Sequence, residues 1–322
     1  MAEEIRNVII IGGGPSGFTA GLYLGRANLR PLLFAGAKWG GQLMLTTEVE
    51  NYPGFVEGIQ GPELMQKFRA QAEKFECEVK SDDVTAVDFS KTPFKVTAAG
   101  KDYLTKAVVI ATGAETKWLG LPNEQKLIGR GISSCAPCDA FFFKDKKVIV
   151  VGGGDSAMEE ALTLTKFALE VTIVHRRDEF RASKIMIDKA KNNPKIKFIL
   201  NSVVSDILGD VKVEGVKIKN VKDQKETEMP IDGIFVAIGH LPVSGIFKGQ
   251  LELDEKGYIV RKVKGNPSTS SGSSDAYGMM TSKEGVFVAG DVHDVHFKQA
   301  VTAAGYGCQA ALEVERWIEM QE

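Results

Sequence analysis

Two stretches of the chain repeat one pattern of hydrophobic and polar positions. Residues 8–24 and residues 148–168 each begin with a run of branched apolar side chains, continue through three glycines, and end in a segment of small and apolar residues. An apolar run followed by a glycine turn and a helix-compatible segment predicts strand, turn and helix. Because Gly12 and Gly152 open the two turns, this internal repeat predicts two related α/β units.

The remaining hydrophobic pattern predicts further strands around these two units. Apolar positions within 62–75 recur at helical spacing and predict a core helix, and small residues from Gln299 toward Trp317 predict a last helix. Residues 264–274 are rich in serine and glycine, and we expect them to form an exposed loop. Strands are predicted at 31–34, 84–87, 94–96, 104–110, 171–174, 233–238 and 285–289, with short strands within 198–229.

Composition narrows the class of protein. A length of 322 residues with 43% hydrophobic side chains suits roughly two domains. A net charge of -2 does not indicate nucleic acid or an anionic membrane as a partner. No export signal and no apolar run near the ~20 residues that span a bilayer is visible, so a soluble protein is expected. Four cysteines are too few for a secreted disulfide scaffold, which favours a reducing cytoplasm.

The first glycine turn matches a dinucleotide-binding fingerprint. Gly12 allows the tight turn, Gly14 allows a pyrophosphate to approach the backbone, and Gly17 allows close packing of helix and strand. An acidic residue that binds a ribose hydroxyl is usual after the second strand, but here Phe34 is followed by Ala35 and Gly36. The first site therefore does not resemble a standard NAD site. The alternative is that this fingerprint binds no nucleotide and serves only the packing of helix and strand.

The second fingerprint is followed by cations instead. His175, Arg176 and Arg177 end the strand at 171–174, and Arg181 lies four residues farther on. Guanidinium groups at this strand end suit a 2'-phosphate and favour NADPH over NADH, with a solvated basic turn as the alternative. Asp291, after the buried strand at 285–289, could supply to the first site the carboxylate that Ala35 and Gly36 lack.

Cys135 and Cys138 lie between the two fingerprints. Thiols at this spacing can close a small disulfide ring, and a helix that starts here would favour the thiolate. Pro137 suits a first helical turn, and Ser133 or Ser134 could cap it. Zinc is the alternative, but it needs four ligands, and only Cys77, Cys308 and four scattered histidines remain.

Taken in order, these motifs resemble the low-molecular-weight NADPH-dependent thioredoxin reductases over nearly the whole chain. The resemblance implies two Rossmann-like dinucleotide-binding domains, the second inserted into the first, in a cytoplasmic homodimer. An FAD domain would comprise residues 1–117 and 248–322, and an NADPH domain residues 118–247. The matching segments are 12–17, 40–54, 111–113, 135–139, 152–160, 175–182, 233–241 and 285–311.

The resemblance also implies roles for individual residues. Electrons would pass from NADPH through FAD to the cysteine pair and then to oxidised thioredoxin. Cys138 would lie nearest the flavin, Cys135 would attack the partner disulfide, and Asp139 would act as general acid and base. The implied FAD site comprises Gly12, Gly14, Pro15, Ser16, Gly41, Gln42, Asn51, Val84, Ala111, Thr112, Gly113, Gly290, Asp291, Lys298, Gln299 and Ala300. The implied NADPH site comprises Gly152, Gly154, Asp155, Ser156, His175, Arg176, Arg177, Arg181, Ile238, Gly239 and His240.

Two other functions are compatible with the same motifs. The enzyme could reduce another dithiol carrier, either glutaredoxin-like or linked to a peroxiredoxin. Alternatively, a non-catalytic sensor could bind FAD and use the cysteine pair as a switch, although the intact second fingerprint argues against that role. Turnover of NADPH with defined disulfide partners distinguishes the three.

Overall fold

The computed structural model describes residues 4–262 and 277–321. The loop predicted at 264–274 lies outside the described residues. The chain divides into two compact units. Unit 1 comprises Met1–Glu115 with Leu241–Glu322, and unit 2 comprises Thr116–His240. The predicted insertion of the second unit into the first is therefore confirmed. The predicted domain boundaries fall after residues 117 and 247, whereas the compact units divide after residues 115 and 240.

The sheet of unit 1 has seven strands. Its order is β5-β2-β1-β8-β7-β6, with β19 paired to β8. Strands β5, β2, β1, β8 and β19 run parallel, whereas β7 and β6 extend the sheet as an antiparallel ribbon. The strands are β1 (Ile5–Ile11), β2 (Leu32–Phe34), β5 (Glu78–Lys80), β6 (Val84–Asp88), β7 (Phe94–Ala98), β8 (Lys101–Ile110) and β19 (Val286–Val288).

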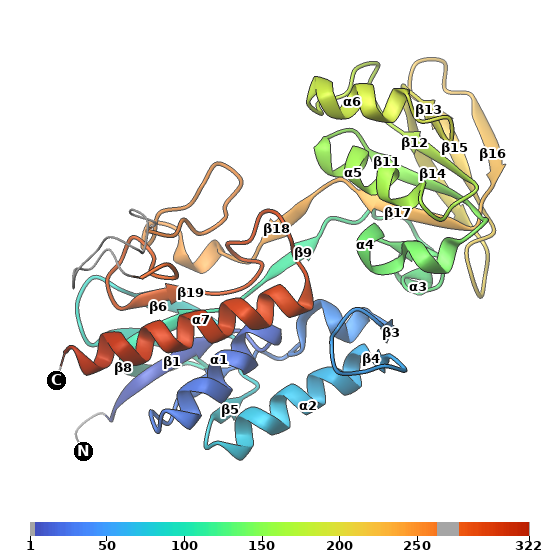
Figure 1. The fold of residues 1–322 in the computed structure, drawn as a ribbon. Coiled ribbons are helices and arrows are strands. Elements are labelled where there is room, and N and C mark those ends of the chain that lie inside the picture. Colours follow the sequence, from blue (N-terminus) through green and yellow to red (C-terminus); the bar gives the residue numbers. More distant parts are fainter. Residues whose placement is uncertain (1–3, 263–276, 322) are drawn as a thin grey trace. The chain divides into compact units, whose positions relative to one another are not determined.

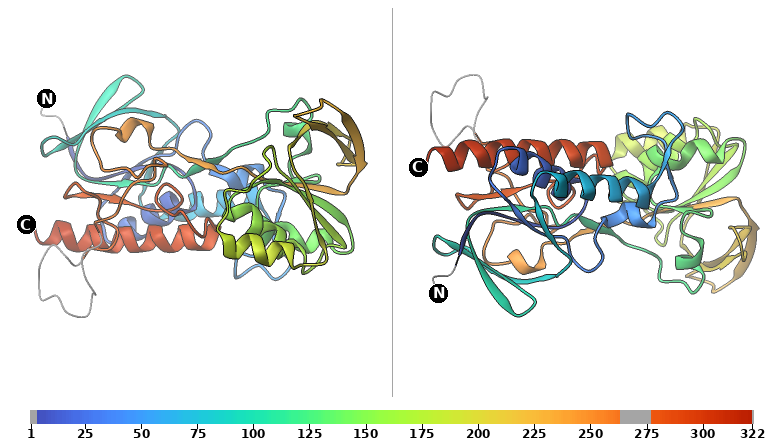
Figure 2. Two further views of the ribbon diagram at one scale, coloured as in Figure 1. Left: turned by 90° about the horizontal axis from the view of Figure 1, so that it is seen from above. Right: turned by 90° about the horizontal axis from the view of Figure 1, so that it is seen from below.

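Helices α1 (Pro15–Arg26), α2 (Gly61–Lys74) and α7 (Ala300–Glu319) pack in unit 1, with α1 lying along α7 (Figure 1). Figure 2 shows α1 and α7 together on one side of the sheet. Alternate residues of β1 point to opposite faces, as a strand requires. Val8 and Ile10 join the cluster under the helices, whereas Ile9 and Ile11 join Phe34, Phe94 and their neighbours in a second cluster.

The segment between β2 and α2 contains short elements of secondary structure. It contains the 3-10 helix η1 (Gly41–Leu45) and a small antiparallel pair, β3 (Glu48–Val49) with β4 (Ile59–Gln60). Near the limits of the two units, β9 (Ala114–Thr116) pairs with β18 (His240–Pro242). The 3-10 helix η3 (Gly245–Phe247) buries Phe247 in the cluster that contains Ile9 and Phe34.

Unit 2 has its own parallel sheet, in the order β10-β17-β11-β12-β13. Helices α5 (Asp155–Leu164) and α6 (Lys184–Lys191) pack with it through a cluster that includes Val150, Ala157 and Ile173. A second cluster joins the sheet to the antiparallel strands β14 (Ser202–Leu208), β15 (Gly215–Asn220) and β16 (Glu226–Pro230). The parallel strands are β10 (Ile132–Ser133), β11 (Lys147–Gly152), β12 (Glu170–Val174), β13 (Ile196–Ile199) and β17 (Gly233–Ala237).

Each unit therefore has a parallel sheet with a strand, glycine turn and helix at its centre, and the predicted α/β fold class is confirmed. One helix differs in length, because α5 ends at Leu164 rather than continuing to Ala168. The backbone turns after Thr165, and the amide of Ala168 donates to the Leu164 carbonyl. Three short helices complete unit 2: α3 (Glu124–Leu127), α4 (Ala136–Asp139) and the 3-10 helix η2 (Ala140–Phe143).

Candidate active site

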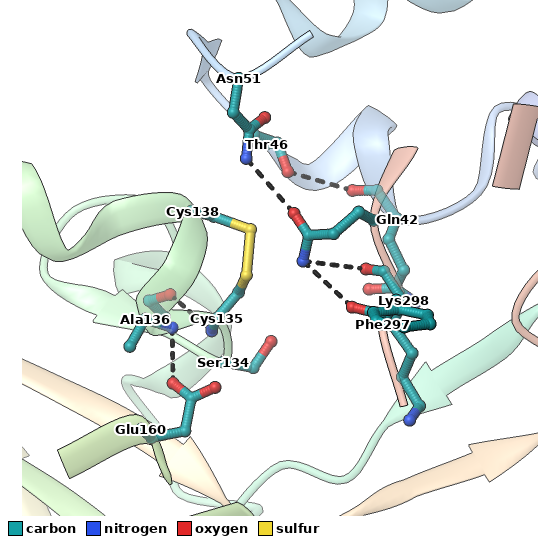
Figure 3. The surroundings of a disulfide bond; sticks show 12 residues. Gln42, Thr46, Asn51, Ser134, Cys135, Ala136, Cys138, Glu160, Phe297 and Lys298 are labelled. Carbon is teal, nitrogen blue, oxygen red and sulfur yellow. Dashed lines mark hydrogen bonds between the residues drawn. A yellow bond between two sulfur atoms is a disulfide. The ribbon is translucent and has the colours of Figure 1, made fainter. Parts of the chain in front are cut away.

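Cys135 and Cys138 form a disulfide across the first turn of α4 (Figure 3). Cys135 is half-buried and directly precedes the helix, whereas Cys138 is exposed. The amides of Cys138 and Asp139 both donate to the Cys135 carbonyl, at 3.2 and 3.1 Å, which closes the turn around the pair. The predicted pairing of these two cysteines as a disulfide is confirmed.

The serine cap predicted for this turn is wrong. Cys135 itself is the N-cap, and no side chain caps the helix in the usual way. Ser133 Oγ instead accepts a hydrogen bond from the Cys135 amide at 3.0 Å, and Ser134 Oγ lies 3.3 Å from Thr116 Oγ1. The amide of Ala136 donates to Glu160 Oε2 at 2.5 Å, so a distant carboxylate takes the place of the predicted cap.

Two carboxyl groups lie beneath the cysteine turn. Burial raises the pKa of Asp139, and a hydrogen bond from Ser133 partly opposes that rise. Burial also raises the pKa of Glu160, to about 7, with an opposing effect of the Ala136 amide and a further rise from the charge of Asp139. Asp139 was predicted to act as an acid and base. Glu160 was missed, because its proximity to the cysteine turn depends on how α5 packs against α4.

The first fingerprint of unit 1 brings distant segments together. Gly12 has φ of 114°, and a Cβ there would lie 2.2 Å from the Ala111 carbonyl oxygen, so this turn requires glycine. A Cβ on Gly14, in contrast, would meet nothing within 4 Å. Gly41 lies close by, since a Cβ built on Gly41 would stand 3.9 Å from Gly14 Cα. The amide end of α1 thus faces open space beside η1.

Residues from the end of the chain complete this edge of unit 1. The Ala289 amide donates to the Ile110 carbonyl at 2.8 Å, which places Gly290 beside the turn. A Cβ on Gly290 would lie 2.5 Å from the buried Ser16 Oγ. The structure therefore brings together the predicted residues at 12–16, 111–113 and 290–291, which lie at the ends of three neighbouring strands.

Asp291 is half-buried at this edge, and its Oδ1 atom is fully buried. Its Oδ1 has no hydrogen-bond partner within the described residues. Burial, followed by the nearby charge of Asp294, raises the pKa of Asp291 to about 6. A buried carboxylate without a donor is costly, which indicates that a hydroxyl or similar donor belongs there.

The loop after Asp291 is shaped by a residue that the sequence analysis did not single out. The carboxylate of Asp294 accepts hydrogen bonds from the amides of His296, Phe297 and Lys298, each at 2.9 Å. Lys298 takes a positive φ of 49° there, and its Nζ donates to the Val295 carbonyl at 2.7 Å. An aspartate three residues after Asp291 is too common a pattern to predict this turn.

Five other predicted FAD residues have the following places. Gln42 Nε2 donates to the Ala114 carbonyl at 3.4 Å, and Thr112 Oγ1 donates to the Val243 carbonyl at 2.6 Å. Ala300 begins α7, after Gln299 as its N-cap. Val84 begins β6, and its side chain packs against the cluster that contains Ile9 and Phe34. Its predicted role stays a prediction.

The second fingerprint, in unit 2, is built in the same way. A Cβ on Gly152 would lie 2.4 Å from the Ala237 carbonyl oxygen, whereas one on Gly154 would meet nothing within 4 Å. Ser156 is exposed in the first turn of α5. Asp155 Oδ1 accepts from both the amide and the hydroxyl of Ser183, each at 2.8 Å, so this carboxylate ties the start of α5 to the start of α6.

The arginines lie beside this fingerprint, after β12. The Arg181 amide donates to the Gly153 carbonyl at 2.7 Å, which returns the arginine loop to the glycine turn. Within the described residues, neither Arg176, Arg177 nor Arg181 forms an ion pair. His175 is buried, with Nε2 3.1 Å from the Glu179 carbonyl oxygen, and burial lowers its pKa. The neutral ring anchors the loop that carries the arginine side chains.

The predicted turn at 238–240 follows β17. Gly239 has space around its Cβ position, and its carbonyl accepts from the Lys117 amide at 3.0 Å. Ile238 is exposed and His240 begins β18. In the parts of the chain that the structure covers, no cluster of three histidine, cysteine or acidic side chains could hold a metal ion. No helix there is long and apolar enough to cross a bilayer.

Known proteins are similar to this chain in sequence and in fold. The profile of the family described as pyridine nucleotide-disulphide oxidoreductase matches residues 6–307. A thioredoxin reductase of Mycolicibacterium smegmatis is 48% identical over 321 residues, covering 100% of this chain and 99% of that protein. One from Streptomyces coelicolor is 53% identical over 318 residues, covering 98% and 95%. The solved thioredoxin reductase from Giardia duodenalis is 43% identical, with a TM-score of 0.90 over 98% of this chain and 99% of that one.

Proposed function

Because the chain belongs to the pyridine nucleotide-disulphide oxidoreductase family, we propose that it is a thioredoxin-disulfide reductase that uses NADPH and FAD. The observation that carries the proposal is the Cys135–Cys138 disulfide, located in a unit that has its own dinucleotide fingerprint and is inserted into another. Relatives with about half of their residues identical over nearly the full length have the same activity in their names.

The residues of unit 1 fit FAD. The open space at Gly14 lies at the N-terminus of α1, where amide groups and the helix dipole favour a pyrophosphate. The half-buried Asp291 carboxylate has one buried oxygen, Oδ1, without a partner in the described chain, which a hydroxyl of the ribityl chain would satisfy. We assign residues 1–117 and 248–322 to FAD binding, with Gly12, Gly14, Pro15, Ser16, Gly41, Gln42, Asn51, Val84, Ala111, Thr112, Gly113, Gly290, Asp291, Lys298, Gln299 and Ala300 at the site.

The residues of unit 2 fit NADPH. Gly154 offers open space at the N-terminus of α5, as Gly14 does at α1. The guanidinium groups of Arg176, Arg177 and Arg181 make no ion pair in the described chain, so they are available to a 2'-phosphate. We assign residues 118–247 to NADPH binding, with Gly152, Gly154, Asp155, Ser156, His175, Arg176, Arg177, Arg181, Ile238, Gly239 and His240 at the site.

When bound, NADPH supplies a hydride and FAD passes the electron pair to the disulfide. The chain's own residues then carry out disulfide exchange. The thiolate of Cys135 attacks one sulfur of oxidised thioredoxin, and Asp139 protonates the sulfur that leaves. The thiolate of Cys138 next attacks Cys135 Sγ, which restores the Cys135–Cys138 bond and releases reduced thioredoxin. Thioredoxin gains the two electrons that the cysteine pair loses; one of its two protons comes from Asp139 and the other from water.

Two further properties belong to the same proposal. We infer a homodimer, supported by the resemblance to this family and by exposed apolar side chains, such as Tyr23 on α1 and Leu312 on α7. A cytoplasmic location suits an enzyme whose dithiol must be kept reducible, with two other cysteines free. Sedimentation equilibrium measures the first property, and fractionation of cells measures the second.

The deciding experiment follows NADPH oxidation by the FAD-loaded protein. Oxidised thioredoxin is expected to sustain turnover, and oxidised glutaredoxin at equal concentration serves as the comparison. Turnover with glutaredoxin alone would identify another dithiol carrier as the substrate. A yellow protein that oxidises no NADPH with either disulfide would identify a sensor and contradict the proposal.

A further inference from the structure

Glu160 extends from α5 to the backbone of the cysteine turn. Its Oε2 accepts the hydrogen bond of the Ala136 amide at 2.5 Å, and Figure 3 shows this carboxylate directed at the residue after Cys135. Amides at a helix start have no partner within the helix, so this hydrogen bond supplies one. Glu160 thus holds the peptide that links Cys135 to the rest of the ring.

A second carboxyl group belongs to the same turn. Asp139 is the last residue of α4, is largely buried, and bonds to Ser133. The charges that act on Glu160 are those of Asp139 on α4 and Glu159 on its own helix. Although α6, η2, β11, β12 and β17 also pack against α5, no lysine or arginine among the described residues stabilises the Glu160 carboxylate.

Two half-buried acids in one turn region, with no cation to stabilise them, do not ionise independently. Loss of the first proton leaves a negative charge that opposes loss of the second, so the protons are released in two steps that belong to the pair. Burial raises the pKa of both groups, and that of Glu160 rises to about 7. The pair therefore keeps its last proton to a higher pH than either acid would alone.

We propose that Glu160 is a positioning residue that holds the Cys135–Cys138 turn and, as the partner of Asp139, keeps an acidic proton available for the leaving thiolate. The inference rests on the proposed function, because it concerns the exchange step of that reaction. Cys135 S⁻ forms a bond to one substrate sulfur, the substrate S–S bond breaks, and the departing sulfur takes its proton from Asp139. Asp139 recovers a proton from water when Cys138 closes the disulfide.

Glu160→Gln separates the two roles of this residue. The glutamine side chain keeps an oxygen that can accept from the Ala136 amide, but it removes the second ionisable group. Asp139 then ionises at lower pH, and the protonated form becomes scarce above neutral pH. Glu228→Gln is the matched control, since Glu228 is an exposed glutamate on β16 of the same unit.

The test uses full-length, FAD-loaded protein that has been reduced with dithiothreitol and desalted, so it needs neither NADPH nor thioredoxin. Exchange is measured from pH 6 to 9 with hydroxyethyl disulfide, whose thiolate leaves poorly, and with an aromatic disulfide, whose thiolate leaves without a proton. For Glu160→Gln we expect the pH at which the hydroxyethyl disulfide rate falls to move about one unit lower, so that above this pH the rate is about tenfold lower than in wild type. The rate with the aromatic disulfide should stay unchanged.

A hydroxyethyl disulfide profile that overlays that of the Glu228→Gln control would overturn the proposal, as would equal slowing with both disulfides. If Glu160→Gln does not fold, carbon NMR of wild-type protein with labelled glutamate decides the matter. A glutamate carboxyl that titrates near neutral pH supports the coupled pair, and titration of every glutamate below about pH 5 overturns it. Failure of the proposed function would show separately, as absent NADPH turnover with intact exchange.

Discussion

Asn51 donates a hydrogen bond from Nδ2 to Gln299 Oε1 at 3.3 Å, although the two residues are 248 positions apart. Gln299 also caps α7 through a reciprocal pair with Thr302. The contact joins the loop after η1 to the segment after Asp291, both of which belong to unit 1. Residues proposed to surround one flavin thus come from the two ends of the chain.

Replacing one cysteine tests the redox role directly. For Cys138→Ser we expect disulfide reductase activity to fall at least about a thousandfold, because the ring cannot close, while FAD stays bound. The measurement is NADPH-dependent reduction of thioredoxin together with the flavin absorption spectrum. Cys308→Ser, outside the disulfide, is the matched control and should retain turnover. Retained turnover in Cys138→Ser would remove this pair from the electron path.

The arginine loop sets the choice of nucleotide. Arg176→Ala combined with Arg177→Ala should raise KM for NADPH by about ten- to a hundredfold, because hydrogen bonds to a charged phosphate are lost, and leave KM for NADH nearly unchanged. Steady-state kinetics with both nucleotides provides the comparison. Lys212→Ala with Lys225→Ala, two exposed cations of the same unit, controls for net charge. Equal effects on NADPH and NADH would mean that another group holds the phosphate.

The Asp291 carboxylate should destabilise the apoprotein and favour the binding of FAD. Its folded pKa, about 6, is above the usual value of 3.8, so the folded chain binds the proton more tightly. Stability is then highest at low pH and falls as pH rises from about 4 to about 6. Asp291→Asn should therefore stabilise the apoprotein at pH 7.5, by roughly 3 kcal/mol at most, and weaken FAD binding. Thermal melts of apoprotein and FAD titrations measure the two effects; a lower Tm for the asparagine variant would contradict this assignment.

The two glycines of the first turn should fail in different ways. Gly12→Ala places a methyl 2.2 Å from the Ala111 oxygen at a positive φ, so we expect little folded protein. Gly14→Val enters open space at a φ of -88°, so the variant should fold but lose FAD at least about tenfold in affinity. Circular dichroism and FAD titration separate these outcomes. Gly245→Val, also in open space, is the control; unchanged FAD affinity in Gly14→Val would place the pyrophosphate elsewhere.

Features that depend on neighbouring residues could be predicted from the chain alone. An apolar run, a tight turn and an amphipathic segment are each set by local sterics and periodicity, so residues 8–24 and 148–168 predicted the centre of both units. The spacing of Cys135 and Cys138 allowed a disulfide within one turn, and the two fingerprints around the pair favoured that bond over zinc. Element ends were less certain, as the early end of α5 shows.

Features that depend on packing between distant segments needed the folded chain. Ser133 and Ser134 were locally sound caps for α4, but the Ala136 amide is satisfied by Glu160, which only the packing of α5 brings close. The pKa of Asp291 and of Glu160 likewise depends on burial, which no local pattern reports. The pKa of each of these carboxyl groups depends on which parts of the chain exclude water from it, and those parts come together only in the folded protein.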